Sequence, residues 1–296
     1  MTNRMIELSD GPASLSVRLD QLVIAREEQP EVTVPLADIA CLVVAHPRVL
    51  FTHAVLSGLA ARGAAFVVCN ERFLPIGMLL PLDAHTTQAE QFAMQAAAPL
   101  PVRNRLWRQI VQAKVRAQGR LLARLRGDDQ GLFSLADEVT LGDRTNIEAQ
   151  ASRRYWAALF PDTGFRRLVE ADDENRFLNY GYAILRAIVA RALCAAGLHP
   201  SFGLHHHHRN DAYCLADDVM EPFRPIVDAA VVRICDEHGA DAPMDKATKA
   251  VLFEALLGRF IIEEDSRTLF DLLSHTAATL AQALAGQRKD LVLPEL

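Results

Sequence analysis

The segment NRFLNYGYAILRAIVARALCAAG, residues 175–197, places apolar side chains on almost every side when it is drawn as a helix. A helix that is hydrophobic all round belongs in the interior of a protein. Polar groups in such a helix need partners, because unpaired buried polar atoms cost free energy. Its polar residues include Asn175, Asn179, Tyr180, Tyr182 and Arg186. We therefore predict that this segment is the buried centre of a helical domain, with specific partners for its polar side chains.

Helical patterns continue on both sides of this segment. Between Leu106 and Leu125, apolar residues recur every three or four positions, which is the spacing of one helix face. The predicted helices around the central one span residues 102–126, 145–160, 217–238, 246–263 and 266–285. Strand-like alternation is absent from about residue 90 onward, so we predict a large all-α domain over residues 91–296.

The N-terminal part has a different pattern. Residues 5–81 fall into short apolar runs rich in Val and Ile, with turn residues between them, which is typical of strands. In LSVRLDQLVIARE, apolar residues alternate on both sides of Asp20-Gln21, as in a hairpin. One short helix is predicted from Thr52 to Arg62, closed by Gly63. The predicted fold class is α+β, with a small β-rich N-terminal domain at residues 1–90 followed by the larger all-α domain.

The composition excludes several classes of protein. The chain has no run of eighteen uncharged apolar residues, and its start lacks a secretory signal, so we expect a soluble cytoplasmic protein without a membrane partner. The five cysteines show no CxxC spacing, and we expect them to be reduced residues of the core. Neither GxGxxG nor GxxxxGK[ST] occurs, which makes nucleotide-driven chemistry unexpected.

One segment is strongly basic although the formal net charge of the chain is -6. A negative chain is a poor polyanion ligand, because Lys and Arg supply the affinity for phosphates. Residues 99–127 nevertheless hold eight basic residues and no Asp or Glu. They are Arg103, Arg105, Arg108, Lys114, Arg116, Arg120, Arg124 and Arg126. We predict that this face follows a phosphate backbone, although exposed arginines often only interact with water.

The segment after the central helix, residues 197–228, is dense in groups that bind metals. It contains the run His205 to His208, and Asp218 and Glu221 lie three apart, on one helix face. A histidine from the preceding turn and these carboxylates would suit a divalent cation. The alternatives are a solvated loop or a tag, and the internal position argues against a tag. A second acidic candidate is Glu148, one turn into the helix at 145–160, where a lone Glu commonly just favours the helix dipole.

Three separated motifs resemble one family. NIEAQASRRYW, NRFLNYGYAILR and GLHPSFGLHH followed by NDAYCLADDVMEPFRPIVD are similar to motifs of the CRISPR adaptation integrase, Cas-one, of type II systems. The N-terminal runs LSVRLDQLVI and ARGAAFVVCNERFLPIGMLLP extend the resemblance over nearly the whole chain. It implies an N-terminal dimerisation domain, a helical catalytic domain, a homodimer, and a companion adaptation protein, Cas-two. It also implies an enzyme that joins short double-stranded DNA to the CRISPR array and has nuclease side activity.

The resemblance also implies a site for Mn²⁺ or Mg²⁺. By motif, its catalytic and metal-binding residues fall on Glu148, His206 and Glu221, with Asp218 as a further acidic residue near the metal. The histidine run is longer here than in the usual pattern. Counting three from Gly203 selects His206, while His205, an accessory candidate, and His207 remain possible.

The predicted DNA contacts come from two groups of residues. The basic helix contributes Arg103, Arg105, Arg108, Lys114, Arg116 and Arg120, and Arg167, Arg186 and Arg224 are further candidates. Two other functions stay open at this stage. His205 and His208, with a carboxylate, would suit a zinc hydrolase or a two-His iron site. A non-catalytic DNA-binding scaffold is the second alternative.

Overall fold

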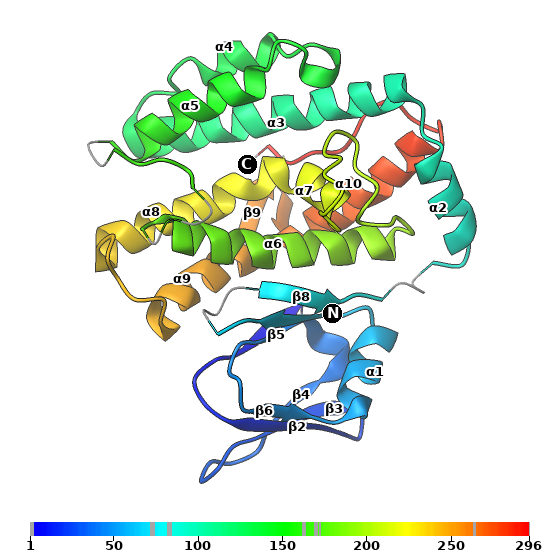
Figure 1. Cartoon of the computed structure of the whole chain (residues 1–296), viewed down its shortest axis with the longest axis vertical. Helices are drawn as coiled ribbons and strands as arrows, with labels where there is room; N and C mark the ends of the chain where they lie inside the picture. Colours follow the sequence, from blue (N-terminus) through cyan, green and yellow to red (C-terminus); the bar gives the residue numbers. More distant parts are fainter. Residues whose placement is uncertain are drawn as a thin grey trace.

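A computed structural model describes residues 3–71, 75–81, 85–161, 164–168, 171, 173–262 and 265–295. Two four-stranded sheets and one helix form one end of the molecule, and the other helices form the other end (Figure 1). The predicted α+β fold class is confirmed.

The two sheets contain all of the short apolar runs that the sequence indicated. One sheet has the order β1-β5-β7-β8, with β8 antiparallel to its neighbour and the other strands parallel. Its strands are β1 (Arg4–Leu8), β5 (Ile39–Val44), β7 (Ala65–Cys69) and β8 (Pro75–Leu79). The other sheet has the order β4-β3-β2-β6. Its strands are β2 (Ala13–Arg18), β3 (Gln21–Ala25), β4 (Val32–Pro35) and β6 (Val49–Phe51).

The predicted hairpin and helix of this part are both present. Leu19 and Asp20 have positive φ angles of 49° and 60°, which a two-residue turn between antiparallel strands requires. The turn is one residue earlier than the sequence indicated, because Gln21 is already paired in β3. Helix α1 (His53–Ala61) follows Thr52 and is closed by Gly63, although the Thr52 side chain makes no capping hydrogen bond.

Strand β5 joins the two halves of the protein. Every residue in it is buried, because alternate side chains face two different cores. Leu42 and Val44 pack with the second sheet and α1, whereas Cys41 and Val43 belong to the core that contains the helices. A continuous apolar run is what a strand covered on both faces needs. The N-terminal sheets and the helices are therefore joined through the two faces of β5.

The helices at residues 100–126, 147–159, 175–195 and 269–284 follow the predicted boundaries within a few residues, and those at 88–96 and 132–137 were not predicted. They are α2 (Gln88–Ala96), α3 (Leu100–Arg126), α4 (Leu132–Asp137), α5 (Ile147–Leu159), α6 (Asn175–Ala195), α7 (Cys214–Met220), α8 (Arg224–His238), α9 (Lys246–Leu257) and α10 (Leu269–Leu284). Three 3-10 turns complete the list: η1 (Leu36–Asp38), η2 (Leu141–Asp143) and η3 (Glu221–Phe223). Helix α3 lies above α6 and α8, and α6 runs between the other helices and the sheet (Figure 1).

Two predicted helices are wrong in part. The helix predicted over residues 217–238 is divided into α7 and α8 by η3, where Pro222 follows Glu221. The helix predicted over residues 246–263 ends at Leu257, and a hairpin of β9 (Arg259–Ile262) and β10 (Asp265–Thr268) follows. The C-terminal part is thus helical with one added hairpin among the described residues.

Helix α6 is the centre of the helical part, as predicted. By length and composition it could span a membrane, but 78% of that window is buried inside the fold, as in the core helix of a soluble protein. Its polar side chains have partners. Tyr180 donates to Glu7 at 2.9 Å, which connects α6 to the first sheet. Asn175 and Asn179 both accept from Arg167. Tyr182 and Arg186 contact acidic side chains described below.

Candidate active site

Glu148 is held at the start of α5 by two capping residues. Asn146 has a φ of 54°, and its side chain accepts a hydrogen bond from Ala149 N. The buried carboxylate of Asp143 accepts from Ile147 N at 2.9 Å and from Glu148 N at 3.0 Å. Such caps satisfy backbone donors that have no partner within the helix. They set the direction in which the Glu148 side chain leaves the helix.

Glu221 lies at the junction of α7 and α8, with only 5% of its side chain exposed. Its Oε1 accepts from Arg224 Nε at 2.9 Å. Burial would raise the pKa of Glu221, but the positive charges of Arg224 and Lys114 outweigh it and lower the pKa to about 2. Glu221 is therefore a carboxylate at neutral pH.

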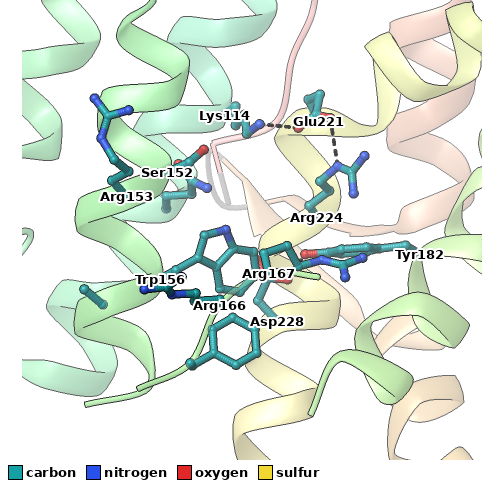
Figure 2. Close-up of a pocket in the computed structure, with 13 residues that line it drawn as sticks. Lys114, Ser152, Arg153, Trp156, Arg166, Arg167, Tyr182, Glu221, Arg224 and Asp228 are labelled. Carbon is teal, nitrogen blue, oxygen red and sulfur yellow. Dashed lines mark hydrogen bonds and ion pairs between the residues drawn. The ribbon is translucent and has the colours of Figure 1, made fainter. Parts of the chain in front are cut away.

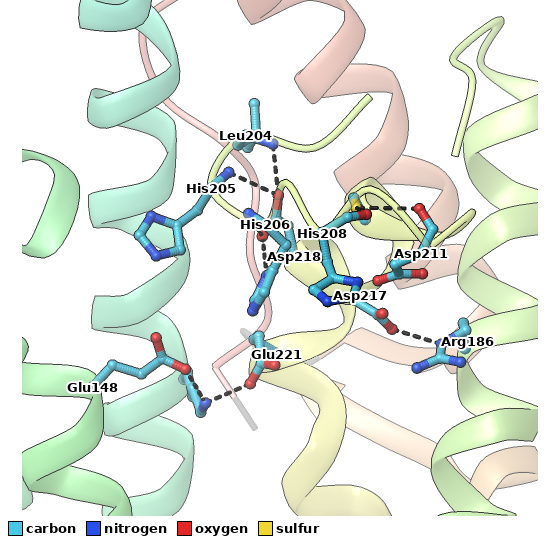
Figure 3. A network of polar contacts seen from close by, with 12 residues as sticks. Glu148, Arg186, Leu204, His205, His206, His208, Asp211, Asp217, Asp218 and Glu221 are labelled. Atoms are coloured by element: carbon cyan, nitrogen blue, oxygen red, sulfur yellow. Dashed lines mark hydrogen bonds and ion pairs between the residues drawn. The ribbon is translucent and has the colours of Figure 1, made fainter. Parts of the chain in front are cut away.

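Lys114 brings the two glutamates together. Its Nζ lies 2.6 Å from Glu148 Oε1 and 2.5 Å from Glu221 Oε2 (Figure 3). Burial alone would lower the pKa of Lys114, but the two carboxylates raise it, so the side chain is a cation. Lys114 was predicted to contact DNA as part of the basic helix. In the structure it is buried, with 7% of its surface exposed, and it pairs with both glutamates, so a DNA contact stays a prediction.

Asp218 holds the histidine turn. Its fully buried carboxylate accepts from the backbone N–H groups of Leu204 at 2.6 Å, His205 at 3.0 Å and His206 at 3.3 Å. It also binds His206 Nδ1 at 2.6 Å, and this hydrogen bond raises the pKa of His206. The contact uses Nδ1 and not Nε2. Asp218 was predicted as an acidic residue near the metal. In the structure its Oδ1 contacts His206 N and Nδ1, and its Oδ2 accepts from Leu204 N and His205 N, so Asp218 positions the turn. A place for Asp218 near a metal stays a prediction.

Gly203 is needed for the same turn. A Cβ at this position would lie 2.3 Å from the carbonyl oxygen of His206 and 3.1 Å from Asp218 Oδ2. Only glycine leaves room for the backbone to pass so closely over Asp218. The spacing between Gly203 and His206 thus has a physical cause.

The structure separates the candidate histidines. The His205 ring stacks on Trp107, with ring centroids 4.4 Å apart and planes 3° apart. His206 lies edge-on to the same tryptophan and on the side of the two glutamates (Figure 3). The stack turns His205 away from His208 (Figure 3), which removes the geometric basis for a His205–His208 zinc or iron site. The hydrogen bond to Asp218 and the negative charges of Asp218, Glu221 and Glu148 raise the pKa of His206, so both glutamates act on this ring.

The donor chemistry fits a divalent metal ion. Among the described residues, no three His, Cys, Asp or Glu side chains surround a common point at metal-ligand distance, since the Lys114 ammonium lies between the two glutamates. A cation is nevertheless already bound by both carboxylates, and the imidazole of His206 lies beside them. Two carboxylates and one imidazole are ligands that Mg²⁺ and Mn²⁺ accept.

A cavity of about 510 Å³ opens next to this cluster (Figure 2). Lys114 and Glu221 lie on its wall, so the cavity and the carboxylate pair share residues. Its other charged and aromatic lining residues are Arg153, Arg166, Arg167, Arg224, Asp228, Trp156, Phe165 and Tyr182. Arg167 and Arg224 both lie over the Tyr182 ring, at 5.4 and 4.5 Å from its centroid. The excess of guanidinium groups makes the cavity suited to an anion.

Asp228 at the base of this cavity is a buried carboxylate that accepts hydrogen bonds from Tyr155 at 2.7 Å and from Tyr182. Burial raises the pKa of Asp228 to about 6, against the lowering effect of both hydroxyls and the nearby arginines. A folded-state pKa above the usual 3.8 means that stability falls as pH rises from about 4 to 6. We expect the wild type to lose roughly 3 kcal/mol relative to Asp228→Asn across that window.

Urea unfolding of the wild type and Asp228→Asn at pH 4, 5, 6 and 7 measures this difference. Burial also raises the pKa of Asp217 to about 6, so this residue adds its own pH dependence to stability. Asp217 is present in both proteins, and its contribution therefore cancels in the comparison. A difference that stays constant from pH 4 to 7 would contradict the assignment of a raised pKa to Asp228.

The predicted DNA contacts differ in exposure and partners. Arg108 is exposed and Arg103 and Arg105 are half-buried on α3, consistent with a basic face. Arg116 pairs with Asp137 at 2.7 Å and Arg120 with Glu295 at 3.0 Å, so the fold supplies counter-ions that the segment itself lacks. Outside α3, Arg186 pairs with Asp217 at 2.6 Å, and Arg167 and Arg224 line the cavity.

Several residues of the site were missed or given another role from the sequence. Asp143 precedes Ile147 by four positions, a spacing that could have indicated its capping role. Trp107 and Asp228 gave no signal, because their partners His205, Tyr155 and Tyr182 come from other elements. These contacts depend on tertiary packing.

Comparisons with known proteins agree with this fold. A family model described as CRISPR associated protein Cas1 matches residues 8–257. The chain is 33% identical over 300 residues to the CRISPR-associated endonuclease Cas1 of Neisseria meningitidis serogroup C (strain 8013), covering 100% of this chain and 97% of that protein.

Two solved structures show the same fold at low sequence identity. A casposase bound to its integration product superposes with a TM-score of 0.80 at 17% identity, covering 100% of this chain and 94% of that chain. A Cas6-RT-Cas1–Cas2 complex gives a TM-score of 0.74 at 16% identity, covering 99% of this chain and 36% of that chain. Because the family model spans most of the sequence and the Neisseria relative aligns over all of it, this chain belongs to the family of CRISPR associated protein Cas1.

Proposed function

We propose that this protein is the integrase of CRISPR adaptation, a metal-dependent enzyme that joins the 3′-hydroxyl ends of short duplex DNA to phosphodiesters of the CRISPR array. The observation that carries the proposal is the meeting of Glu148 and Glu221 at one cation, beside an imidazole that Asp218 holds in place. The endonuclease name of the Neisseria relative and the casposase integration product support the same reaction class.

Glu148, His206 and Glu221 would hold the divalent ion, which we propose to be Mn²⁺ or Mg²⁺. Carboxylate oxygens suit both ions, and the imidazole nitrogen favours Mn²⁺. When bound, such an ion supplies Lewis acidity to the phosphate that is attacked.

The protein's own residues then have distinct tasks. Arg224 and Arg167 on the cavity wall bind and orient the phosphodiester, since guanidinium groups match phosphate oxygens. His206, with Nδ1 bound to Asp218, either serves as a ligand or donates a proton to the departing oxygen. Water in place of the 3′-hydroxyl gives hydrolysis, which accounts for nuclease side activity.

The proposed partners are double-stranded DNA, a second copy of this chain and Cas2. The Cas6-RT-Cas1–Cas2 complex among the similar structures supports a Cas2 partner. We propose that residues 1–90 form the dimerisation domain and residues 91–296 the catalytic domain, in a cytoplasmic homodimer.

The basic face of α3 provides a prediction about DNA affinity. Arg105→Ala combined with Arg108→Ala removes two cations from α3, a helix that contains no Asp or Glu. Because each phosphate contact contributes about 0.9 to the slope of log K against log salt, we expect the slope to flatten by about 2. A fluorescence titration of a labelled duplex between 50 and 300 mM NaCl, roughly the range in which this effect is large, measures it.

The matched control for this experiment is Arg18→Ala with Arg62→Ala in the second sheet and α1. These arginines pair with Glu31 and Asp20 and lie far from α3 in the chain. The control should keep the wild-type slope. An unchanged slope in the α3 variant would remove α3 from the DNA-binding surface.

The reaction itself is tested with a short duplex that has 3′-hydroxyl ends, a supercoiled plasmid and Cas2, with and without Mn²⁺. We expect joined, relaxed product only when metal and 3′-hydroxyls are both present, and no joining by a duplex with 3′-dideoxy ends. Duplex binding without any metal-dependent product would instead indicate a DNA-binding scaffold.

A further inference from the structure

Lys114 is a charged side chain in a place where lysine is rarely found. It projects from the middle of the 27-residue helix α3 and is almost fully buried. Burying an ammonium group is costly unless close opposite charges compensate for the lost water. The two contacts to Glu148 and Glu221, at 2.6 and 2.5 Å, provide that compensation. The lysine and the two acids therefore form one electrostatic unit.

The oxygens that Lys114 binds are those that a metal ion would need. Glu221 uses Oε1 for Arg224, so Oε2, the atom in contact with Lys114, is its remaining oxygen. Glu148 contacts the same ammonium through Oε1. An ion held by both glutamates would approach the position of Nζ. At such short separations an ammonium and a dication repel each other strongly.

The cavity offers a place for a displaced ammonium. Lys114 is part of its wall, and four arginines on the same wall make it a site for phosphate (Figure 2). The four-carbon stem of lysine has several rotatable bonds, so the ammonium can move while α3 stays in place. The same side chain can therefore exchange two carboxylates for a phosphate of bound DNA.

We propose that Lys114 is a built-in counter-ion for the Glu148–Glu221 pair, and that Lys114 and a divalent ion bind these carboxylates in competition. The inference rests on the proposed metal site. It explains how the buried Glu221 and the half-buried Glu148 stay close to each other, and it makes metal affinity depend on a residue that is not a ligand. It also predicts that DNA phosphate, by pairing with the released ammonium, strengthens metal binding.

The test compares Mn²⁺ binding by the full-length wild type and Lys114→Met, both first treated with EDTA, by electron paramagnetic resonance of free Mn²⁺. We expect Lys114→Met to bind Mn²⁺ about tenfold more tightly, because the competing charge is gone. In EDTA we expect its melting temperature to lie below that of the wild type, because two carboxylates lose their counter-ion. The difference should shrink at saturating Mn²⁺.

Lys114→Gln keeps a polar side chain and should show the same gain if Lys114→Met does not fold. Lys114→Arg keeps the charge and should show no gain. Lys246→Met is the surface control, because its side chain is 84% exposed and it is also a lysine in a helix. Wild-type or weaker Mn²⁺ affinity in both neutral variants overturns the competition. Absence of Mn²⁺ binding in the wild type and in both neutral variants would instead overturn the proposed metal site, so the two failures differ.

Discussion

Glu148→Gln is expected to lose at least about a thousandfold of integration activity while remaining folded. The amide has nearly the same shape but no charge, so it binds a divalent ion poorly. Glu148 has 23% of its side chain exposed, and Lys114 keeps Glu221 as a partner, so stability should change little. The yield of joined DNA in Mn²⁺, with circular dichroism as the folding check, measures both effects.

The matched control is Glu90→Gln, which also removes a glutamate from the first turn of a helix, here α2. It should retain full activity, because any general effect on a helix dipole is the same in both variants. If Glu148→Gln integrates DNA at the wild-type rate, Glu148 is not part of the catalytic set.

Asp218→Ala is expected to cost about 3 to 5 kcal/mol of unfolding free energy and to abolish integration. The substitution leaves the buried N–H group of Leu204, the part-buried N–H groups of His205 and His206, and the His206 ring without their acceptor. Unpaired buried donors carry a large desolvation penalty. Urea unfolding measures the stability, and the integration assay reports the loss of His206 positioning.

Asp217→Ala is the control for this second prediction. Asp217 is adjacent in the chain, but its ion pair is to Arg186, whose side chain is 37% exposed. We expect a much smaller loss of stability, because partly exposed ion pairs contribute little. Equal losses in the two variants would mean that Asp218 has no special role in the histidine turn.

The periodicity of the sequence was sufficient for most of the fold. The apolar segment at 175–197 became the central helix α6, and the alternating runs before residue 81 became strands. Prediction failed at residues 259–268, because a short apolar run directly after an amphipathic helix continues the helical pattern. The hairpin there depends on pairing between β9 and β10, which no local period reveals.

The site was predictable only where a motif named its residues. Glu148, His206 and Glu221 came from motifs. In the structure the two glutamates contact one ammonium, and their charges act on His206. Spacing alone could not choose between His205 and His206. The choice depends on a stack with Trp107 and on the carboxylate of Asp218, and both contacts join distant segments.

Lys114 illustrates the remaining limit. In the sequence it is one of eight basic residues in a segment without acids, which suggests an exposed cationic face. Its two carboxylate partners are supplied by α5 and η3. A helix pattern gives the direction of a side chain relative to its own helix, but not which charges other elements place opposite it.

The central claim is that Glu148, His206 and Glu221 bind one divalent ion. The most direct measurement is an anomalous difference map, at the manganese edge, from crystals of the full-length protein grown with Mn²⁺. The account predicts one strong peak within about 2.5 Å of a carboxylate oxygen of each glutamate and of a ring nitrogen of His206. A peak at His207 and His208 with none between the glutamates would contradict it.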